Sequence, residues 1–458
     1  MTRTTTAIRI GIGALVSAAS VAAVALGAGA VPWPSVSTPA ATVSVEPAPA
    51  EVLLACDGPL LAVGRTAEDA SAVSVAADAS VVSGAEGGGA PAESTLAIPG
   101  VADATAPLLS QLPDGRDAVA IAAASSVSAS YGDLAGYAAS ECRAPQMESW
   151  IVGGDVATGS TGLLLIANPT EVNAVVSLDV YGVDGVTTPA GADAIAVPAG
   201  TQTVLPLASV AGGEASPVVR IEATGAPVRV TLQSSIVRTL VPGGIDLQPS
   251  TTPALEQVMP GVAVTDEAAS GENPAGLVRL LSTSDATATL RVVGEDGTDA
   301  RAPEDVVLTA DQPLSVDLGG LPAGRYTVRV DSDVPLVAAA WQTTGFGEAS
   351  DFAWYAAAPE ITGETLVAVP DGPSPRLEIA NTRDVDTTVV VTGEGGEQIV
   401  DVAAGSSVSV GLEGAAVYTF DAGETGVHAS VGFADASSLA SLPVDQDPAS
   451  PPPVVVYP

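Results

Sequence analysis

The sequence predicts an all-β protein in which immunoglobulin-like β-sandwich modules follow one another after an N-terminal transmembrane or signal helix. Three observations support this. Apolar residues make up 47% of the 458 residues but aromatic residues only 3%, and the abundant β-branched Val suits pleated sheets. Short alternating runs are separated by Gly-containing turns, which is typical of sandwiches. A long uncharged run precedes all of them.

Residues 1–31 predict a signal-anchor helix. Before Ile10 the only charged residues are Arg3 and Arg9, and no charge occurs from Ile10 to Val31. As a helix this run would cross about 30 Å of hydrocarbon, whereas a cleaved signal peptide has an apolar stretch of only about 7–15 residues. A retained helix is therefore favoured, and cleavage after Ala30 stays open because small residues stand at that position.

Both alternatives export the rest of the chain, since the Arg-bearing flank stays in the cytoplasm. The expected localisation is the cell membrane, with a single pass and an extracytoplasmic C-terminal region, or secretion if the helix is removed. Residues 32–51 are rich in Pro, Ser, Thr and Ala and lack any helical or strand period. They are expected to form an extended spacer.

A weak internal repeat divides the remaining chain into four β modules. An apolar strand that runs into a turn recurs at residues 163–169, 277–283 and 376–382. Each is followed by a second strand and by an acidic Gly turn, which is a hairpin signal. The predicted modules cover residues 52–155, 156–265, 266–372 and 373–458. The alternative is a chance pattern in a chain rich in Val, Ala and Gly. In the first module, residues 67–95 are expected to form a loop.

Cys56 and Cys142 are the two cysteines, and both fall in the first predicted module. In an exported chain an isolated pair predicts a disulfide. Closing a loop of about 85 residues would stabilise the fold by roughly 4–5 kcal/mol on chain-entropy grounds. Metal binding and redox chemistry are the alternatives, but the chain has one His and no Cys-x-x-Cys.

The charge balance excludes nucleic acid as a partner. The formal net charge is −38, from 53 acidic and 15 basic residues, and every basic residue is Arg. Nucleic-acid binding needs a clustered basic surface. The only membrane contact expected is therefore through the N-terminal helix.

Residues for catalysis or cofactor binding are scarce, so we predict no enzyme activity, no cofactor and no metal site. His428 is the single His, no G-x-S-x-G elbow occurs, and a phosphate loop would need the missing Lys. The acidic turns Glu295–Asp299 and Asp331–Asp333 offer oxygen atoms to Ca²⁺, but they are better explained as solvated hairpin turns. A glycosidase needs only two carboxylates, so that class stays open.

Trp341, Trp354 and Tyr355 cluster in a chain with few aromatic residues. Such side chains can anchor a partner. The alternative is that they fill the junction between consecutive modules.

The segment Val31-Pro32-Trp33-Pro34, the strand end from Leu164 to Thr170 and the cysteine pair together resemble an actinobacterial family of membrane-anchored envelope proteins of unknown function. The resemblance covers nearly the whole chain. It implies no activity and no site residues.

The predicted function is that of a non-enzymatic, membrane-anchored structural or interaction scaffold in the cell envelope, with an envelope protein or a glycan as partner. The alternative is an array of carbohydrate-binding modules or a glycan-acting enzyme that uses carboxylates alone. Paired acids beside an exposed Trp in one cleft would favour this alternative, and scattered acids would favour the scaffold.

Overall fold

The computed structural model describes residues 3–30, 43–45, 49–65, 71–271, 275–446 and 454–456. The chain divides into two compact units, one formed by Met1–Pro47 with Pro452–Pro458 and the other by Ala48–Pro451. Most of the predicted spacer, residues 32–42 and 46–48, lies outside the described residues.

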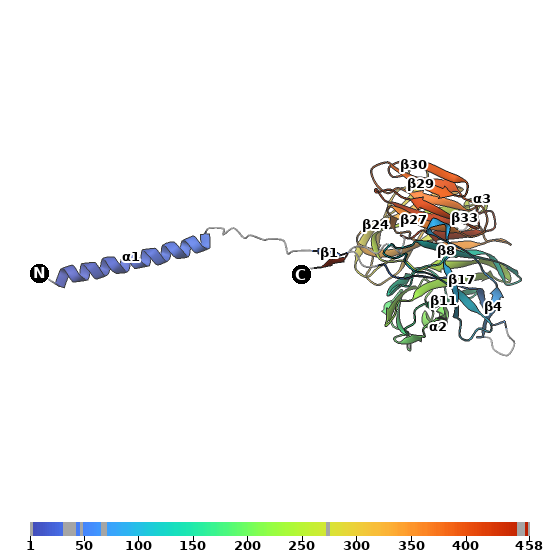
Figure 1. Cartoon of the computed structure of the whole chain (residues 1–458), viewed down its shortest axis with the longest axis horizontal. Coiled ribbons are helices and arrows are strands. Elements are labelled where there is room, and N and C mark those ends of the chain that lie inside the picture. Colours follow the sequence, from blue (N-terminus) through green and yellow to red (C-terminus); the bar gives the residue numbers. More distant parts are fainter. Residues whose placement is uncertain are drawn as a thin grey trace. The chain divides into compact units, whose positions relative to one another are not determined.

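The first unit contains the predicted N-terminal helix, α1 (Arg3–Ala30), seen in Figure 1. Its only other described element is a two-stranded antiparallel sheet of β1 (Val43–Val45) and β35 (Val454–Val456). Within the described residues, no helix combines the length and the apolarity needed to cross a membrane.

The second unit is nearly all β, which confirms the predicted fold class. Its largest sheet has the strand order β18-β17-β11-β15-β6-β7-β2. Most neighbours are antiparallel, and β15 pairs with β6 in parallel. The strands are β2 (Val52–Ala55), β6 (Ala92–Ala97), β7 (Thr105–Gln111), β11 (Ser160–Asn168), β15 (Thr201–Pro206), β17 (Arg229–Arg238) and β18 (Val241–Pro249).

The centre of this sheet, at β11, is buried on both faces, whereas β6 is largely exposed. Leu164 and Ile166 of β11 pack into one core, together with a five-stranded sheet, while Leu163 and Leu165 pack into another, together with two small sheets. Burial on both faces explains the continuous apolar run in β11. The five-stranded sheet contains β10 (Glu148–Ile151), β12 (Ala174–Gly182), β13 (Gly185–Thr187), β14 (Ile195–Val197) and β16 (Val218–Thr224). The small sheets contain β3 (Leu60–Val63) with β4 (Val73–Ala77), and β5 (Ser80–Ala85) with β8 (Ile121–Tyr131) and β9 (Leu134–Glu141).

The third section of the chain forms one sheet around a long strand, β24 (Gly324–Thr343). The first half of β24 pairs with β21, and its second half pairs with β20 and β25. The other strands are β19 (Ala254–Val264), β20 (Gly276–Ser282), β21 (Ala286–Gly294), β22 (Glu304–Leu308), β23 (Leu314–Asp317) and β25 (Phe352–Ala356). Short helices occur at η1 (Glu86–Gly88), α2 (Leu207–Val210) and α3 (Asp266–Ser270).

The last section is a sandwich whose core includes Leu377, Val389 and Phe420. One sheet contains β26 (Glu360–Ile361), β28 (Arg376–Ala380), β31 (Ser407–Gly411), β33 (Val427–Ala434) and β34 (Leu439–Pro443). The other contains β27 (Glu364–Val369), β29 (Thr387–Gly393), β30 (Gly396–Val402) and β32 (Ala416–Asp421).

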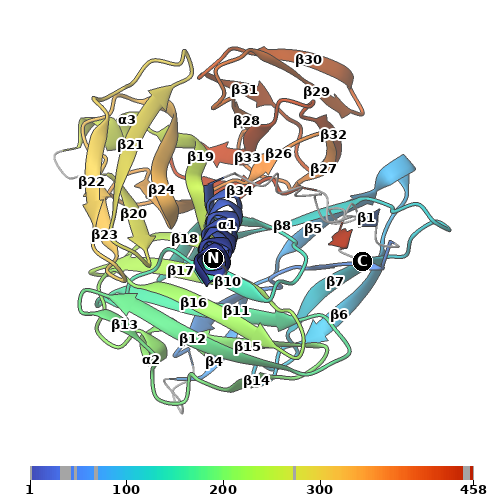
Figure 2. The same cartoon turned by 90° about the vertical axis from the view of Figure 1, so that its left-hand side faces the viewer.

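Four hairpins bring these sections together: β8–β9, β17–β18, β24–β25 and β33–β34. We call their second strands, β9, β18, β25 and β34, the central strands, because each contacts the next and β34 contacts β9. Figure 2 shows the four sections in sequence order around this centre, from blue through green and yellow to red.

The structure does not confirm independent immunoglobulin-like modules in tandem. Residues on both sides of position 155 share the large sheet, and residues 48–451 form one compact unit. The prediction of a loop over residues 67–95 is wrong for residues 71–95, which contain β4, β5 and the start of β6. Residues 67–70 lie outside the described residues. In β4 Val alternates with Ser and Ala, which is a strand pattern in spite of the Ser and Gly content of the segment.

Candidate functional site

A buried carboxylate, that of Asp351 just before β25, joins the four central strands. Its Oδ2 accepts hydrogen bonds from the backbone N–H groups of Tyr137, at 3.0 Å, and Leu439, at 3.3 Å. Its Oδ1 accepts one from the N–H of Ile245 at 3.1 Å. These donors belong to β9, β34 and β18, so a single side chain bonds the other three hairpins.

Two glycines leave room for this carboxylate. A Cβ atom on Gly136 would lie 2.5 Å from Oδ1 of Asp351, and one on Gly244 would lie 2.6 Å from it. Both glycines also have positive φ angles, +144° and +119°, which side chains rarely tolerate. The local sequence is therefore adapted to the acid at position 351.

Burial raises the pKa of Asp351 to about 7, although the backbone N–H groups oppose this by stabilising the ionised form. A second buried acid, Asp246 on β18, accepts a hydrogen bond from the N–H of Trp354 at 2.8 Å. Burial raises the pKa of Asp246 well above its usual value, and the charge of Asp351 raises it further. The central strands thus enclose two acids that resist ionisation.

Arg143, just beyond β9, bonds three hairpins at the other end of the central strands. Its Nη1 donates to the carbonyl of Ser250, and its Nη2 donates to that of Pro443, both at 3.1 Å. Its Nε lies 2.9 Å from Glu141 and 3.1 Å from Asp445. Burial raises the pKa of Glu141 to about 7, against the effect of Arg143.

A cavity of about 300 Å³ lies beside Arg143, between the segments that leave the central strands. We call it the axial pocket. Its volume is at the low end of the range of about 300–1,000 Å³ for small-molecule sites. The polar side chains that line it include Arg143, Glu256, Gln257, Glu360, His428 and Asp445.

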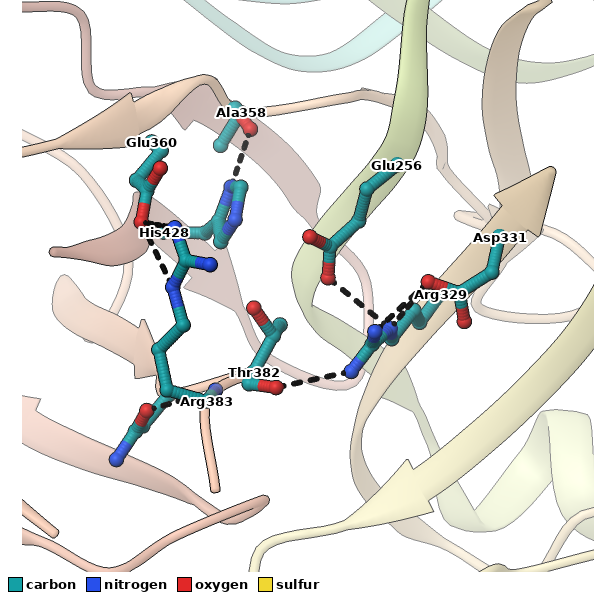
Figure 3. Close-up of polar contacts among 9 residues, drawn as sticks. Glu256, Arg329, Asp331, Ala358, Glu360, Thr382, Arg383 and His428 are labelled. Atoms are coloured by element: carbon teal, nitrogen blue, oxygen red, sulfur yellow. Dashed lines mark hydrogen bonds and ion pairs between the residues drawn. The ribbon is translucent and has the colours of Figure 1, made fainter. Parts of the chain in front are cut away.

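His428, on β33, is 6% exposed, and Figure 3 shows it below Ala358 and beside Glu360. Its Nδ1 lies 2.8 Å from the carbonyl oxygen of Ala358. A carbonyl only accepts, so Nδ1 carries the proton and Nε2 is an acceptor in the neutral ring. Burial lowers the pKa of His428, although the charges of Glu256 and Glu360 oppose this.

Two ion-paired groups flank the imidazole in Figure 3. Glu360, the β-sheet neighbour of His428, pairs with Arg383. On the other side, Arg329 donates from Nε to Asp331 at 2.9 Å and from Nη1 to the carbonyl of Thr382 at 3.1 Å. Oε1 of Glu256 lies 3.0 Å from the same Nε.

The Nδ1–H of His428 is donated to a backbone carbonyl, which leaves Nε2 as an acceptor. Among the described residues, His428 bonds a carbonyl and neither a carboxylate nor a hydroxyl group. The described part of the chain also holds no group of three His, Cys, Asp or Glu residues suited to a metal ion.

The Cys56–Cys142 disulfide is present, as predicted. The predicted partner contact fails for two of its three residues, because β25 runs through the centre of the fold. Trp354 is 5% exposed beneath the guanidinium of Arg279, and Tyr355 is 1% exposed. Trp341 is half-buried opposite Trp354 on β24. Trp354 and Trp341 pack in a cluster that joins the second and third sections, which was the alternative for these residues, whereas Tyr355 lies in the core of the third section.

The prediction of a turn at Asp331–Asp333 is wrong, because these residues lie inside the continuous strand β24, where Asp331 pairs with Arg329. In the turn over Glu295–Asp299, Asp296 accepts hydrogen bonds from the backbone N–H and the hydroxyl of Thr298. Asp351, Arg143 and Glu256 were not found from the sequence. The only local signal for Asp351 is an acid directly before the apolar segment Phe352–Ala356.

Comparison with known families finds one match: a family of unknown function (DUF5719) matches residues 97–413. No curated protein that was compared with the chain matches it.

Proposed function

Since the chain belongs to the DUF5719 family, we propose from its own geometry that it is a non-enzymatic scaffold outside the cytoplasm, which presents docking surfaces in a fixed arrangement. The observation that carries this proposal is that Asp351, in the β24–β25 hairpin, accepts hydrogen bonds from the three other hairpins. Buried polar contacts of this kind hold a fold in one geometry. A docking surface held in one geometry binds more tightly, because it loses less conformational entropy when a partner binds.

The disulfide and the N-terminal sequence support an extracytoplasmic location. Disulfides persist in oxidising compartments and are rare in the cytosol, and Cys56 is bonded to Cys142. The uncharged run from Ile10 to Val31 suits export. We place the protein in an actinobacterial envelope, as the sequence resemblance implies, either anchored by residues 1–31 or released by cleavage after Ala30. Its partner there is an envelope protein or a glycan.

A second pocket favours carbohydrate binding as the alternative. It has a volume of about 620 Å³ and is lined by Trp150 and Tyr181, whose ring centroids are 5.3 Å apart. Glu148 also lines it, so an acid and aromatic rings meet in one cleft. However, Trp150 is only 3% exposed. A hydrogen bond from Arg220 lowers the pKa of Glu148, whereas a glycosidase acid needs a raised pKa. This pocket supports sugar binding better than sugar cleavage.

Fractionation of the native host tests the location. We expect the full chain in the membrane or the medium, with both thiols resistant to alkylation until a reductant is added. Mass spectrometry of the mature N-terminus separates an anchored chain from one cleaved after Ala30. A cytosolic protein with two free thiols would contradict the proposal.

Incubation with purified cell-wall glycans tests the alternative. The scaffold predicts no release of reducing ends. If glycans are retained without cleavage, Glu148→Gln should weaken retention, because Glu148 lines the second pocket. The matched control is Glu222→Gln, which also pairs with Arg220 but does not line the pocket. Cleavage by the wild-type protein would overturn the non-enzymatic proposal.

A further inference from the structure

The second pocket, between the second and third sections of the chain, carries more negative than positive charge. Glu148, Asp179 and Asp311 line it, against one cation, Arg220. Arg220 lies 3.1 Å from Glu148 and 4.0 Å from Asp179, and it also bonds Glu222, which does not line the pocket. One guanidinium is therefore shared among three carboxylates, and the negative charge of the pocket is only partly compensated.

Asp311 contributes a carboxylate that is free for a ligand. It stands in the turn between β22 and β23, where its backbone N–H donates to the carbonyl of Ser282 at 2.9 Å. Within the part of the chain that the structure describes, its side chain accepts no hydrogen bond and makes no ion pair. Asp311 is half-buried, so its carboxylate is partly removed from water without a partner.

Tyr181, on β12, adds an unpaired hydroxyl beside Trp150. Tyr181 is 4% exposed, and its hydroxyl bonds to none of the residues that the structure describes. Unlike the enclosed unpaired hydroxyl of Thr231, it retains accessible surface. Because Tyr181 lines the second pocket, a ligand in the pocket can reach this hydroxyl.

The lining acids face this hydroxyl. Burial raises the pKa of Tyr181, Arg220 lowers it, and the charges of Asp179, Asp311 and Glu148 raise it further. Such effects require that the charges lie close to the phenol. The carboxylates and the free hydroxyl therefore converge on one region of the pocket, where a cationic donor would meet several acceptors.

The other side of the pocket is apolar and includes Leu281, Pro335 and Val337. A cation that enters such a cavity must lose part of its hydration. Guanidinium is more weakly hydrated than ammonium, and its planar fork of N–H donors matches a carboxylate. The pocket therefore suits a guanidinium group better than an ammonium group.

We propose that the second pocket binds an arginine side chain of a partner protein. The inference rests on the proposed function, because it names the chemistry of the partner that the scaffold docks. The net charge of −38 favours a basic partner in the same way, since complementary charge speeds association. A second copy of the chain would be repelled by the same charge.

A neutral sugar fits the pocket less well. It would leave the carboxylate of Asp311 without a counter-charge, and the Trp150 ring offers little surface for stacking because this residue is 3% exposed. The pocket should therefore discriminate by charge. Citrulline tests this directly, because its side chain has nearly the shape of arginine but is neutral.

Fluorine NMR of the full chain labelled with 5-fluorotryptophan reports on the pocket through Trp150, whose signal is assigned with Trp150→Phe. The probes are Nα-acetyl-arginine amide, Nα-acetyl-citrulline amide and Nα-acetyl-lysine amide. Titration in about 150 mM NaCl screens the long-range attraction to the acidic surface. We expect a saturable shift of the Trp150 signal with the arginine derivative, binding about tenfold weaker or worse for the citrulline derivative, and weaker binding of the lysine derivative.

Variants locate the site. Asp311→Asn should weaken binding of the arginine derivative about tenfold, and Asn tolerates the positive φ of 62° at this position. Tyr181→Phe keeps the ring, removes one acceptor and should weaken binding severalfold. Asp184→Asn is the matched control, because it removes the same charge from the second section but does not line the pocket. It should leave binding unchanged.

Four results would each overturn the inference: no shift of the Trp150 signal with the arginine derivative, equal binding of the citrulline derivative, tighter binding of the lysine derivative, or an equal loss in Asp184→Asn. Glycan retention that depends on Glu148, without arginine binding, would overturn it too but would leave the carbohydrate alternative standing. The wild-type comparison of arginine with citrulline decides the matter even if a variant fails to fold.

Discussion

Replacing Asp351 by asparagine perturbs all four hairpins at once while keeping the shape of the side chain. Asparagine offers one acceptor oxygen where aspartate offers two. In the wild type Oδ2 serves Tyr137 and Leu439, and Oδ1 serves Ile245. If the amide oxygen takes the Oδ2 position, the N–H of Ile245 faces an NH₂ group. Leaving this buried N–H unpaired should cost about 1–3 kcal/mol.

The pH dependence of unfolding separates this loss from the titration of Asp351. Its pKa is about 7 in the folded protein and about 3.9 in the unfolded chain. The folded state therefore binds the proton more tightly. The resulting stabilisation is fully present below pH ~4 and is lost as the pH rises to ~7. Between pH 5 and 7 the loss is about 2 kcal/mol, because the slope of 1.36 kcal/mol per pH unit falls as the pH approaches the folded pKa.

Equilibrium unfolding of the oxidised full chain in urea, followed by tryptophan fluorescence at pH 5, 6, 7 and 8, measures both effects. The wild type should become less stable from pH 5 to pH 7. Asp351→Asn should be less stable than the wild type at pH 5, and this difference should shrink or reverse at pH 8. Asp133→Asn is the control, because its side chain is 65% exposed and pairs with Arg65; its effect should stay within about 1 kcal/mol at every pH.

Two results would refute this reasoning. If the wild type is more stable at pH 8 than at pH 5, the three N–H donors outweigh burial and hold Asp351 ionised. If the pH profiles of the wild type and Asp351→Asn are parallel, Asp351 does not titrate in this range. Asp246 and Glu141 also have raised pKa values. Both are present in the two proteins, but the charge of Asp351 raises the pKa of Asp246, so the comparison reports the titration of Asp351 together with its coupling to Asp246.

Other perturbations test the same centre by urea unfolding. Cys142→Ser should lower the unfolding free energy by about 2–5 kcal/mol, and reduction of the wild type should do the same; an unchanged midpoint after reduction would mean that the loop is closed by packing alone. Gly136→Ala should destabilise more than Gly185→Ala, because both have positive φ but only the first places a Cβ against Asp351; equal losses would indicate backbone strain alone. Arg143→Met should cost about 3–5 kcal/mol by leaving buried acids without their cation, and circular dichroism at 25 °C should show whether the variant stays folded; a neutral effect would mean that Glu141 and Asp445 take up protons or water instead.

The sequence predicts local structure well because the relevant signals are local. Acidic Gly turns lie between paired strands, as in the pairing of Gly182 with Gly185 and of Gly393 with Gly396. The disulfide could also be predicted without tertiary information, because the chain has only two cysteines and an exported chain was expected. The first and second predicted modules, however, share one sheet, whose strand β11 is buried on both faces. The uninterrupted Leu163–Ile166 run was a sign of this, because a strand with one wet face alternates.

The contacts of Asp351 and Arg143 could not be predicted from the sequence because they join distant parts of the chain. Asp351 bonds Tyr137 across 214 residues and Arg143 bonds Pro443 across 300. Nothing near either position marks it as central, and a glycine such as Gly136 resembles any turn glycine until the carboxylate beside it is known. The scarcity of Trp suggested Trp354 as a partner contact instead, but its side chain is buried in a hydrophobic cluster.

The contacts of Arg143 and Asp351 make the four hairpins depend on one another for stability. Arg143, in the first hairpin, bonds residues in the second and the last, so its bonds are complete only when residues near Pro443 are folded. Asp351 in turn needs donors from all three other hairpins. Loss of any one hairpin leaves buried charged or polar groups unpaired in the other three, which is costly in a dry interior. The four sections therefore stabilise one another, in contrast to a string of independent domains, and a surface built across them keeps its geometry as long as the protein is folded.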